Sequence, residues 1–133
     1  MFATTKWETA QTCQPIEEYG HGAGHSYGQP DPETGQTYFG RGYVQLTWKA
    51  NYQKMGTLLK EDLVNIPSLA LNPSIAAAIM FEGMEHGLFT GVGLPKYFNA
   101  TTEDWVNARR IINGLDHATD IAAYGRNFHK ALL

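Results

Sequence analysis

The sequence predicts a mainly helical α+β fold, built as a single domain over residues 1–133. Two observations lead to this prediction. Apolar residues recur at helical spacing through most of the chain after residue 47. Before that point, residues 19–42 hold seven glycines and a turn-rich QPDPETG stretch, which indicates a long loop. A chain of this length buries about two-thirds of its unfolded surface around one core.

Two helices are expected in the first half of the chain. Residues 1–8 resemble the end of an apolar helix that stops at Glu8. After the loop, Thr47 is a candidate N-cap, and an i, i+4, i+7, i+11 stripe of apolar residues follows it: Trp48, Tyr52, Met55 and Leu59. Residues 38–46, between loop and helix, are expected to contain at most a short strand or hairpin arm.

Three further helices are expected in the second half. Asn72 and Pro73 start a helix that is apolar nearly all round, which predicts a central place in the core. The next helix is expected from Thr102 to Asn113-Gly114, a pair typical of helix ends. The last helix is expected to begin near His117.

Composition excludes several classes of function. Net charge is −3 and no basic stripe occurs, so nucleic acid is excluded as a partner. The longest apolar stretch, residues 75–81, is too short to span a bilayer, so no membrane insertion is expected. Cys13 is the single cysteine, and the first residues lack the apolar core of a signal peptide. Cytoplasmic synthesis without a leader is therefore expected, with no metal and no cofactor.

Three carboxylates are candidates for glycosidic chemistry. That reaction needs one protonated carboxylic acid and a second carboxylate that activates water or stabilises the cation. Glu8 lies at a helix end beside Trp7, where burial against an aromatic ring favours the protonated acid. Glu17 and Glu18 lie in the loop, where solvent favours the ionised form. Spacing alone does not decide whether these three residues are catalytic or are ordinary exposed surface residues.

A second group of candidates lies in the segment from Tyr38 to Tyr52. Arg41 stands between two glycines, an unusual place for a charge unless it pairs with a carboxylate. Thr47 and Asn51 share one helix face, and Gln45 precedes them. Side chains of this kind beside aromatic rings suit recognition of sugar hydroxyl and acetamide groups.

The same segment carries a family resemblance. FGRGYVQLTWKANY is similar to the segment by which family 19 chitinases and related phage endolysins are identified. WETA, residues 7–10, resembles the motif that holds the general acid of this family. ARRIING, residues 108–114, resembles its Ile-Asn-Gly element. The resemblance covers nearly all of the chain in family order, and it implies a lysozyme-like fold with a substrate cleft.

The resemblance also implies roles for individual residues. Glu8 becomes the general acid, Glu18 the second carboxylate with Glu17 as the alternative, and Thr47 a holder of the attacking water. The implied mechanism is inversion, with carboxyl groups about 6.5–9.5 Å apart. Arg41 is expected to hold the loop carboxylates. The full set of implied substrate-binding residues is Tyr38, Arg41, Gln45, Asn51 and Asn113.

The chain departs from the family pattern in three places. Trp7 replaces a histidine, Asp120 aligns with an arginine of the last helix in plant members, and the helices usual before the acid are absent. We therefore expect self-association or a partner at the N-terminal face.

Three functions remain open. The favoured one is cleavage of β-1,4 links in peptidoglycan by an endolysin that reaches the wall after release from a phage or prophage host cell. The alternatives are a chitinase acting on chitin oligomers and a carbohydrate-binding or assembly protein of lysozyme descent that has lost catalysis.

Overall fold

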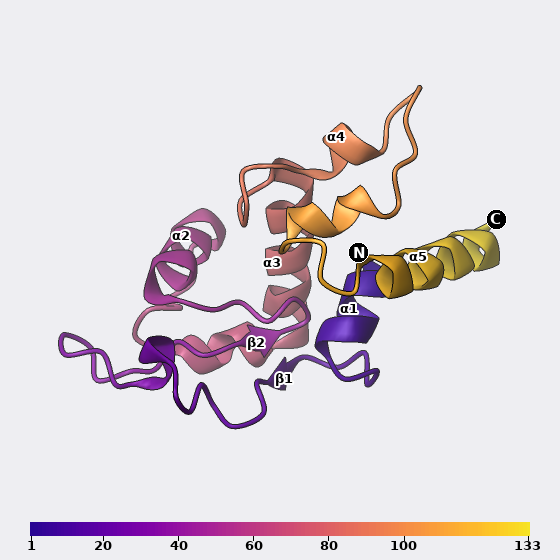
Figure 1. The fold of residues 1–133 in the computed structure, drawn as a ribbon. Coiled ribbons are helices and arrows are strands. Elements are labelled where there is room, and N and C mark those ends of the chain that lie inside the picture. Colours follow the sequence, from indigo (N-terminus) through magenta and orange to yellow (C-terminus); the bar gives the residue numbers. More distant parts are fainter.

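Five α-helices, three 3-10 turns and one two-stranded sheet make up the computed structural model, which describes residues 1–133 (Figure 1). The helices are α1 (Phe2–Glu8), α2 (Lys49–Leu59), α3 (Pro73–His86), α4 (Leu94–Tyr97) and α5 (Ala118–Leu132). The 3-10 turns are η1 (Ser26–Gly28), η2 (Pro67–Leu71) and η3 (Asn107–Ile111). The predicted mainly helical fold class is confirmed. No helix combines the length and the apolar character needed to cross a membrane.

Helix α3 lies at the centre of the molecule, as its apolar sequence predicts (Figure 1). It starts where expected: the Asn72 side chain accepts hydrogen bonds from the backbone N–H groups of Ser74 and Ile75, which satisfies the free donors of the first turn. Its buried residues Ile79, Met80 and Met84 join Tyr52 and Met55 of α2 in the main core.

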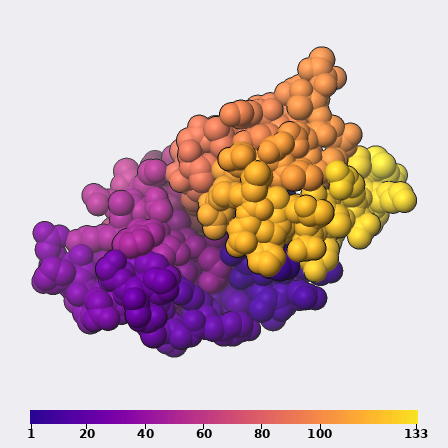
Figure 2. Space-filling view, in the orientation of Figure 1, coloured from indigo at the N-terminus to yellow at the C-terminus, as the bar shows by residue number.

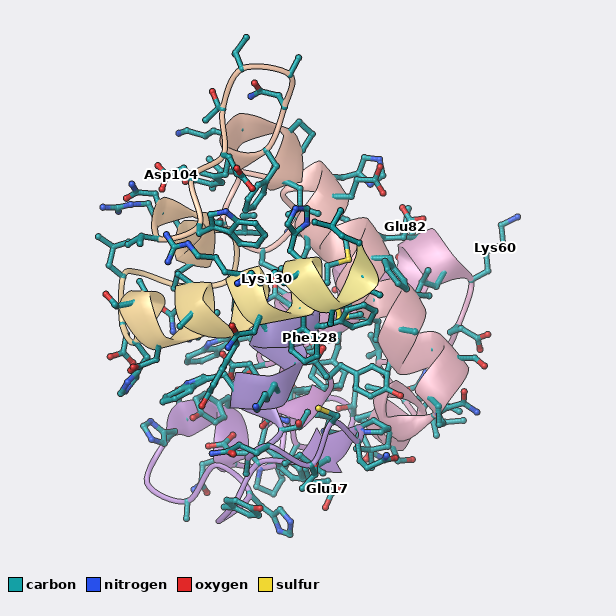
Figure 3. All side chains as sticks on the ribbon, turned by 90° about the vertical axis from the view of Figure 1, so that its right-hand side faces the viewer. Glu17, Lys60, Glu82, Asp104, Phe128 and Lys130 are labelled. Atoms are coloured by element: carbon teal, nitrogen blue, oxygen red, sulfur yellow. The ribbon has the colours of Figure 1, made fainter.

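The two ends of the chain pack together. Helix α5 crosses α1, with Phe128 directed toward it (Figure 3), and the Phe2 and Phe128 rings lie 5.8 Å apart. On the surface, the indigo N-terminal residues lie directly below the orange and yellow C-terminal ones (Figure 2). Helix α1 has only seven residues, too few to be stable alone, so α5 supports it.

The expected short strand is present. Strand β2 (Arg41–Gly42) pairs antiparallel with β1 (Ile16–Glu17), with Glu17 opposite Arg41. Gly42 has a φ of +88°, and a Cβ there would lie 2.8 Å from the backbone oxygen of Ala70. Only glycine satisfies both constraints, so the tight Gly-Arg-Gly backbone allows the loop to meet η2.

Two predicted element boundaries are wrong. Helix α2 is capped by Trp48, whose φ is +76°, and not by Thr47, whose hydroxyl donates to the backbone oxygen of Gln45 instead. The helix expected from Thr102 to Asn113-Gly114 is reduced to η3. There the Asp104 carboxylate accepts from the backbone and the side-chain amide of Asn107, which stabilises a turn before η3 instead of a longer helix.

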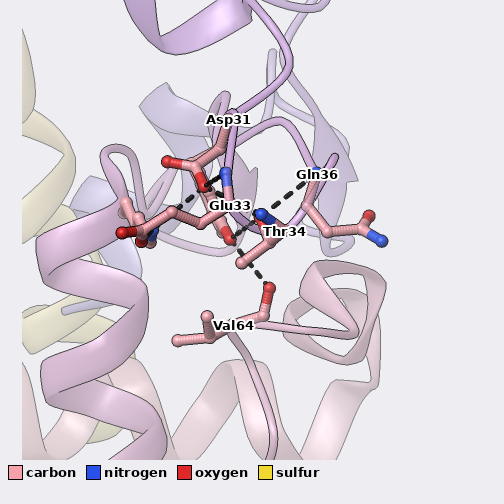
Figure 4. A network of polar contacts seen from close by, with 7 residues as sticks. Asp31, Glu33, Thr34, Gln36 and Val64 are labelled. Atoms are coloured by element: carbon pink, nitrogen blue, oxygen red, sulfur yellow. Dashed lines mark hydrogen bonds and ion pairs between the residues drawn. The ribbon is translucent and has the colours of Figure 1, made fainter.

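A polar network fixes the far end of the loop to α2 (Figure 4). Lys49 Nζ lies 3.0 Å from Asp31 Oδ1 and 2.6 Å from Glu33 Oε2. The same Asp31 oxygen accepts from the backbone N–H groups of Glu33 and Thr34. The hydroxyl of Tyr38 lies 2.8 Å from Thr34 Oγ1 and donates to the backbone oxygen of Val64. The sheet therefore holds the two chain ends of the long glycine-rich loop together, and this network holds residues 31–38 within it.

Candidate active site

Two adjoining cavities, of about 360 and 430 Å³, lie along the boundary between the loop, the start of α2 and the ends of α1 and η3. Four residues line both cavities: Glu8, Tyr27, Gln45 and Thr47. The larger cavity adds both loop carboxylates, Glu17 and Glu18, and the smaller adds the polar and aromatic residues Trp48, Asn51, Phe89 and Asn113. The sequence-predicted acid, second carboxylate and water-holding hydroxyl therefore share one cavity.

Glu8 is held by a buried arginine from the other half of the chain. Arg109 Nη1 donates to Glu8 Oε1 at 2.8 Å, and Arg109 Nε donates to the backbone oxygen of Asp116 at 3.1 Å. The arginine side chain is 3% exposed and the glutamate side chain 18%. The ion pair directs the carboxylate toward Arg109, because the buried guanidinium cannot exchange this contact for water.

Trp7 lines the larger cavity together with Glu8. Its ring packs on His117, with the ring centroids 4.3 Å apart. His117 is the N-cap of α5, and its two ring nitrogens each lie 3.6 Å from a carboxylate, that of Asp116 and that of Asp120. The residue that replaces the family histidine therefore contacts a histidine supplied by α5.

Glu18 is fixed through both of its carboxylate oxygens. Oε2 accepts from the backbone N–H of Gly40 at 3.0 Å, and Oε1 accepts from the Tyr27 hydroxyl at 3.1 Å. The Glu18 backbone N–H also donates to the Gly40 oxygen at 2.7 Å. Glu18 is therefore attached to the Gly-Arg-Gly segment by its backbone and by its side chain.

Glu17 has different surroundings. One of its oxygens lies 3.0 Å from His21 Nε2, and the other lies 3.6 Å from Arg41 Nε. Arg41 is buried, with its guanidinium 3.7 Å from the centre of the Phe39 ring and Nη1 donating to the Tyr52 hydroxyl. Burial raises the pKa of Tyr52 to about 12, against the opposing effect of Arg41. Arg41 thus lies beside a loop carboxylate, as expected, and that carboxylate is Glu17.

The predicted polar face of the cleft is present. Asn51 Nδ2 donates to the backbone oxygen of Thr47, which leaves the side-chain oxygen of Asn51 free at the cavity. Asn113 is exposed and lines the same cavity. Gln45 uses its amide nitrogen internally, donating to the backbone oxygens of Ile16 and Gly42. Its role as a substrate contact is therefore limited to the side-chain oxygen.

Two predicted substrate-binding residues lie away from the cavities. Tyr38 is 3% exposed and its hydroxyl contacts Thr34 and Val64, so direct sugar contact does not fit its position. Arg41 is equally enclosed and lines neither cavity. Both residues were predicted to bind substrate because they belong to the motif. In the structure they are buried and contact other parts of the chain, Tyr38 through Val64 and Arg41 through Tyr52.

Three residues of the site were missed at the sequence level: Arg109, Tyr27 and Trp48. Trp48 was assigned to the core stripe but is 50% exposed, because its positive φ turns it out of the helix register. Tyr27 lies in a loop without periodicity. Arg109 stands beside a second arginine, Arg110, and its partner Glu8 is 101 residues away, so no local signal separated it from a surface charge.

Comparison with known proteins places this site in a family. Residues 7–86, more than half of the chain, match the family model of class I chitinases, glycoside hydrolase family 19. The chain belongs to this family. The match covers Glu8, both loop glutamates and the Gly-Arg-Gly motif, and it ends before Arg109 and Asn113.

Individual relatives agree with this assignment. An endochitinase of Arabidopsis thaliana is 40% identical over 82 residues, which are 57% of this chain and 30% of that protein. Endochitinase CH25 of Brassica napus is 47% identical over 51 residues, 36% of this chain and 16% of that protein. The chain thus matches less than a third of the length of these relatives.

A solved structure supports the fold. The crystal structure of chitinase C from Streptomyces griseus HUT6037 aligns with 91% of this chain and 57% of its own, with a TM-score of 0.53 and 21% identity. At that identity the comparison shows the fold alone, and it agrees with the lysozyme-like class expected from the sequence.

Proposed function

We propose that this chain is a glycosidase that hydrolyses β-1,4 linkages in chitin-like amino-sugar polymers. The observation that carries the proposal is that Glu8, Glu18 and Thr47 line one cavity in a chain of the class I chitinase family. The sequence analysis favoured peptidoglycan as substrate. The comparisons favour its chitinase alternative, because the relatives described above are endochitinases.

The arrangement supports an acid/base mechanism. Glu8 first takes up a proton while it stays hydrogen-bonded to Arg109, and it then gives this proton to the glycosidic oxygen as the bond from that oxygen to the anomeric carbon breaks. Glu18 accepts a proton from a water molecule held with the help of Thr47, and the resulting hydroxyl adds to the opposite face of the sugar. Glu18 then releases its proton to solvent and Glu8 recovers one, so both carboxyl groups return to their starting states. Because water attacks from the opposite face, the proposed product has inverted configuration.

The rest of the cleft suits a neutral amino-sugar chain. Asn51 and Asn113 bring two side-chain amides to the smaller cavity, where they can bond hydroxyl and acetamide groups. The half-exposed Trp48 ring offers an apolar face to a sugar ring. No unpaired cation lines either cavity, so the grip on the polymer comes from aromatic contact and hydrogen bonding.

One experiment separates the open functions. The purified chain is incubated with a chitin hexamer and, in parallel, with purified peptidoglycan, and products are resolved by anomer-sensitive chromatography. We expect cleavage of the hexamer, with α-anomers formed first. Cleavage of peptidoglycan alone would favour the endolysin interpretation. Hexamer binding by calorimetry without cleavage of either polymer would favour a carbohydrate-binding protein of lysozyme descent.

A further inference from the structure

Tyr27 lies between the two cavities. The sequence does not predict this position, because Tyr27 belongs to an irregular loop. It lines both of them, together with Glu8 and Thr47. Its hydroxyl donates to Glu18 Oε1 at 3.1 Å, while the other oxygen of Glu18 is held by the backbone of Gly40. Of the two donors that fix this carboxylate, Tyr27 is therefore the one that a substitution can remove.

The Tyr27 ring is itself held firmly. The His25 ring stacks on it, with centroids 4.9 Å apart and planes 4° from parallel, and the Trp48 ring meets it edge-on at 5.0 Å. Gly22 lies close beneath: a Cβ at that residue would lie 2.9 Å from the Tyr27 ring and 2.7 Å from Gly28. A ring packed on several sides keeps its hydroxyl in one place.

We infer that Tyr27 is a positioning residue for the proposed hydrolysis, one that fixes the Glu18 carboxylate in the direction needed to accept a proton from water. This inference rests on the proposed function, because it assigns a role toward the second carboxylate of that mechanism. Without the hydroxyl, Glu18 is tied by a single oxygen and can rotate about its side-chain bonds. A carboxylate that samples several directions is aligned with the water for only part of the time.

The electrostatic environment is consistent with a permanent donor. Desolvation, followed by the hydrogen bond to Glu18 and the negative charge of Glu18, raises the pKa of Tyr27 above its ordinary value of 10. The hydroxyl therefore keeps its proton throughout the neutral and mildly alkaline range. It acts as a fixed donor and takes no part in proton transfer.

The variant Tyr27→Phe tests this role, since it keeps the ring and removes only the hydroxyl. We expect kcat on a chitin hexamer to fall about tenfold, the effect of losing one hydrogen bond to a charged group. KM should change less than about twofold, because a positioning role acts on the chemical step. The acidic limb of the pH–rate profile should move to higher pH, since the Glu18 carboxylate loses a donor that favours its ionised form.

A matched control is Tyr124→Phe on α5, whose ring lies under Lys6 and outside both cavities. It should leave kcat, KM and the pH profile unchanged. The inference is overturned if Tyr27→Phe keeps full kcat, or if KM alone rises, since the hydroxyl would then serve substrate binding or nothing at all.

A second measurement needs no activity. In Glu18→Gln, NMR titration of the Tyr27 ring should show a lower Tyr27 pKa than in the wild type, because a charged acceptor has been removed. An unchanged Tyr27 pKa would show that the two side chains do not meet in solution, and the inference would fail. If the wild type cleaves no polymer but this titration shifts, the contact stands and the proposed function is what has failed.

Discussion

Replacing Glu8 by glutamine tests both the acid assignment and the ion pair that holds it. Glutamine keeps the shape of the side chain and removes the ability to deliver a proton. We expect the rate on a chitin hexamer to fall at least about a hundredfold, the lower range for a positioned general acid. KM should stay nearly constant, because the interaction lost is made only in the transition state.

The structure adds an expectation about stability. Glutamine still presents an oxygen to Arg109, so the hydrogen bond remains and only its charge is lost. We expect this to lower the free energy of unfolding by about 1 kcal/mol. Glu8→Ala instead leaves the Arg109 guanidinium, 3% exposed, with Asp116 as its single acceptor. Removal of one partner from a buried pair costs about 3–5 kcal/mol. We expect the lower end, about 3 kcal/mol, because Glu8 is itself 18% exposed.

These free energies convert to melting temperatures that calorimetry resolves. At roughly 4 °C per kcal/mol for a domain of this size, Glu8→Gln should melt about 4 °C and Glu8→Ala about 12 °C below the wild type. The control is Glu61→Gln, an exposed residue after α2, which should melt and react like the wild type. Retention of more than about a tenth of the wild-type rate in Glu8→Gln would refute the acid assignment. Equal melting of the Gln and Ala variants would refute the ion-pair argument.

The other predictions concern the loop and the N-terminal face. Glu18→Gln should lower the hexamer rate about a hundredfold and Glu17→Gln much less, because Glu17 is engaged with His21; the reverse order in a rate assay would exchange their roles. Lys49 lowers the pKa of Asp31, so this pair stabilises the fold above the unfolded pKa near 3.8 and the effect is lost as pH falls through the lower folded value. Asp31→Asn should therefore melt below the wild type at neutral pH, with the difference shrinking in acid; a constant difference would contradict this linkage. Phe2 and Leu132, 50% and 73% exposed, border two apolar cavities, and we expect self-association there. Sedimentation should show a concentration-dependent dimer that Leu132→Glu abolishes, and a wild-type monomer at all concentrations would be inconsistent with this expectation.

The features that the sequence predicted correctly are those decided within a few residues of the chain. The start of α3 follows from Asn72 and Pro73, because an Asx cap and a proline at the first position act locally. The end of α1 at Glu8 and the start of α5 after His117 were also placed correctly. The short strand at Arg41–Gly42 was expected, but its partner at Ile16 was not, since strand pairing across the loop leaves no local pattern.

The failures arise where a specific contact or backbone angle overrides the helical repeat. Trp48 fits the apolar stripe of α2 by spacing, but the turn before the helix forces a positive φ and directs its ring to the cleft. The helix expected after residue 102 shortens because Asp104 bonds Asn107 in place of the helical backbone ladder. Tyr38 was predicted to bind substrate because it belongs to the motif, whereas its hydroxyl donates to the backbone oxygen of Val64. The spacing of apolar residues shows none of these: a backbone angle decided the first case, a bond three residues along the chain the second, and a contact 26 residues away the third.

The motif-bearing segment does not complete the site by itself. Residues 7–86 carry both catalytic candidates and the Gly-Arg-Gly turn, yet the partner of Glu8 is Arg109 and the ring beside Trp7 is His117. Arg109 in turn donates to the backbone of Asp116, one residue before the N-cap of α5. Because α1 is too short to hold its own shape, the direction of the proposed acid depends on residues near the end of the chain. A substitution in η3 or at the start of α5 should therefore act on catalysis through Glu8, although it lies outside residues 7–86.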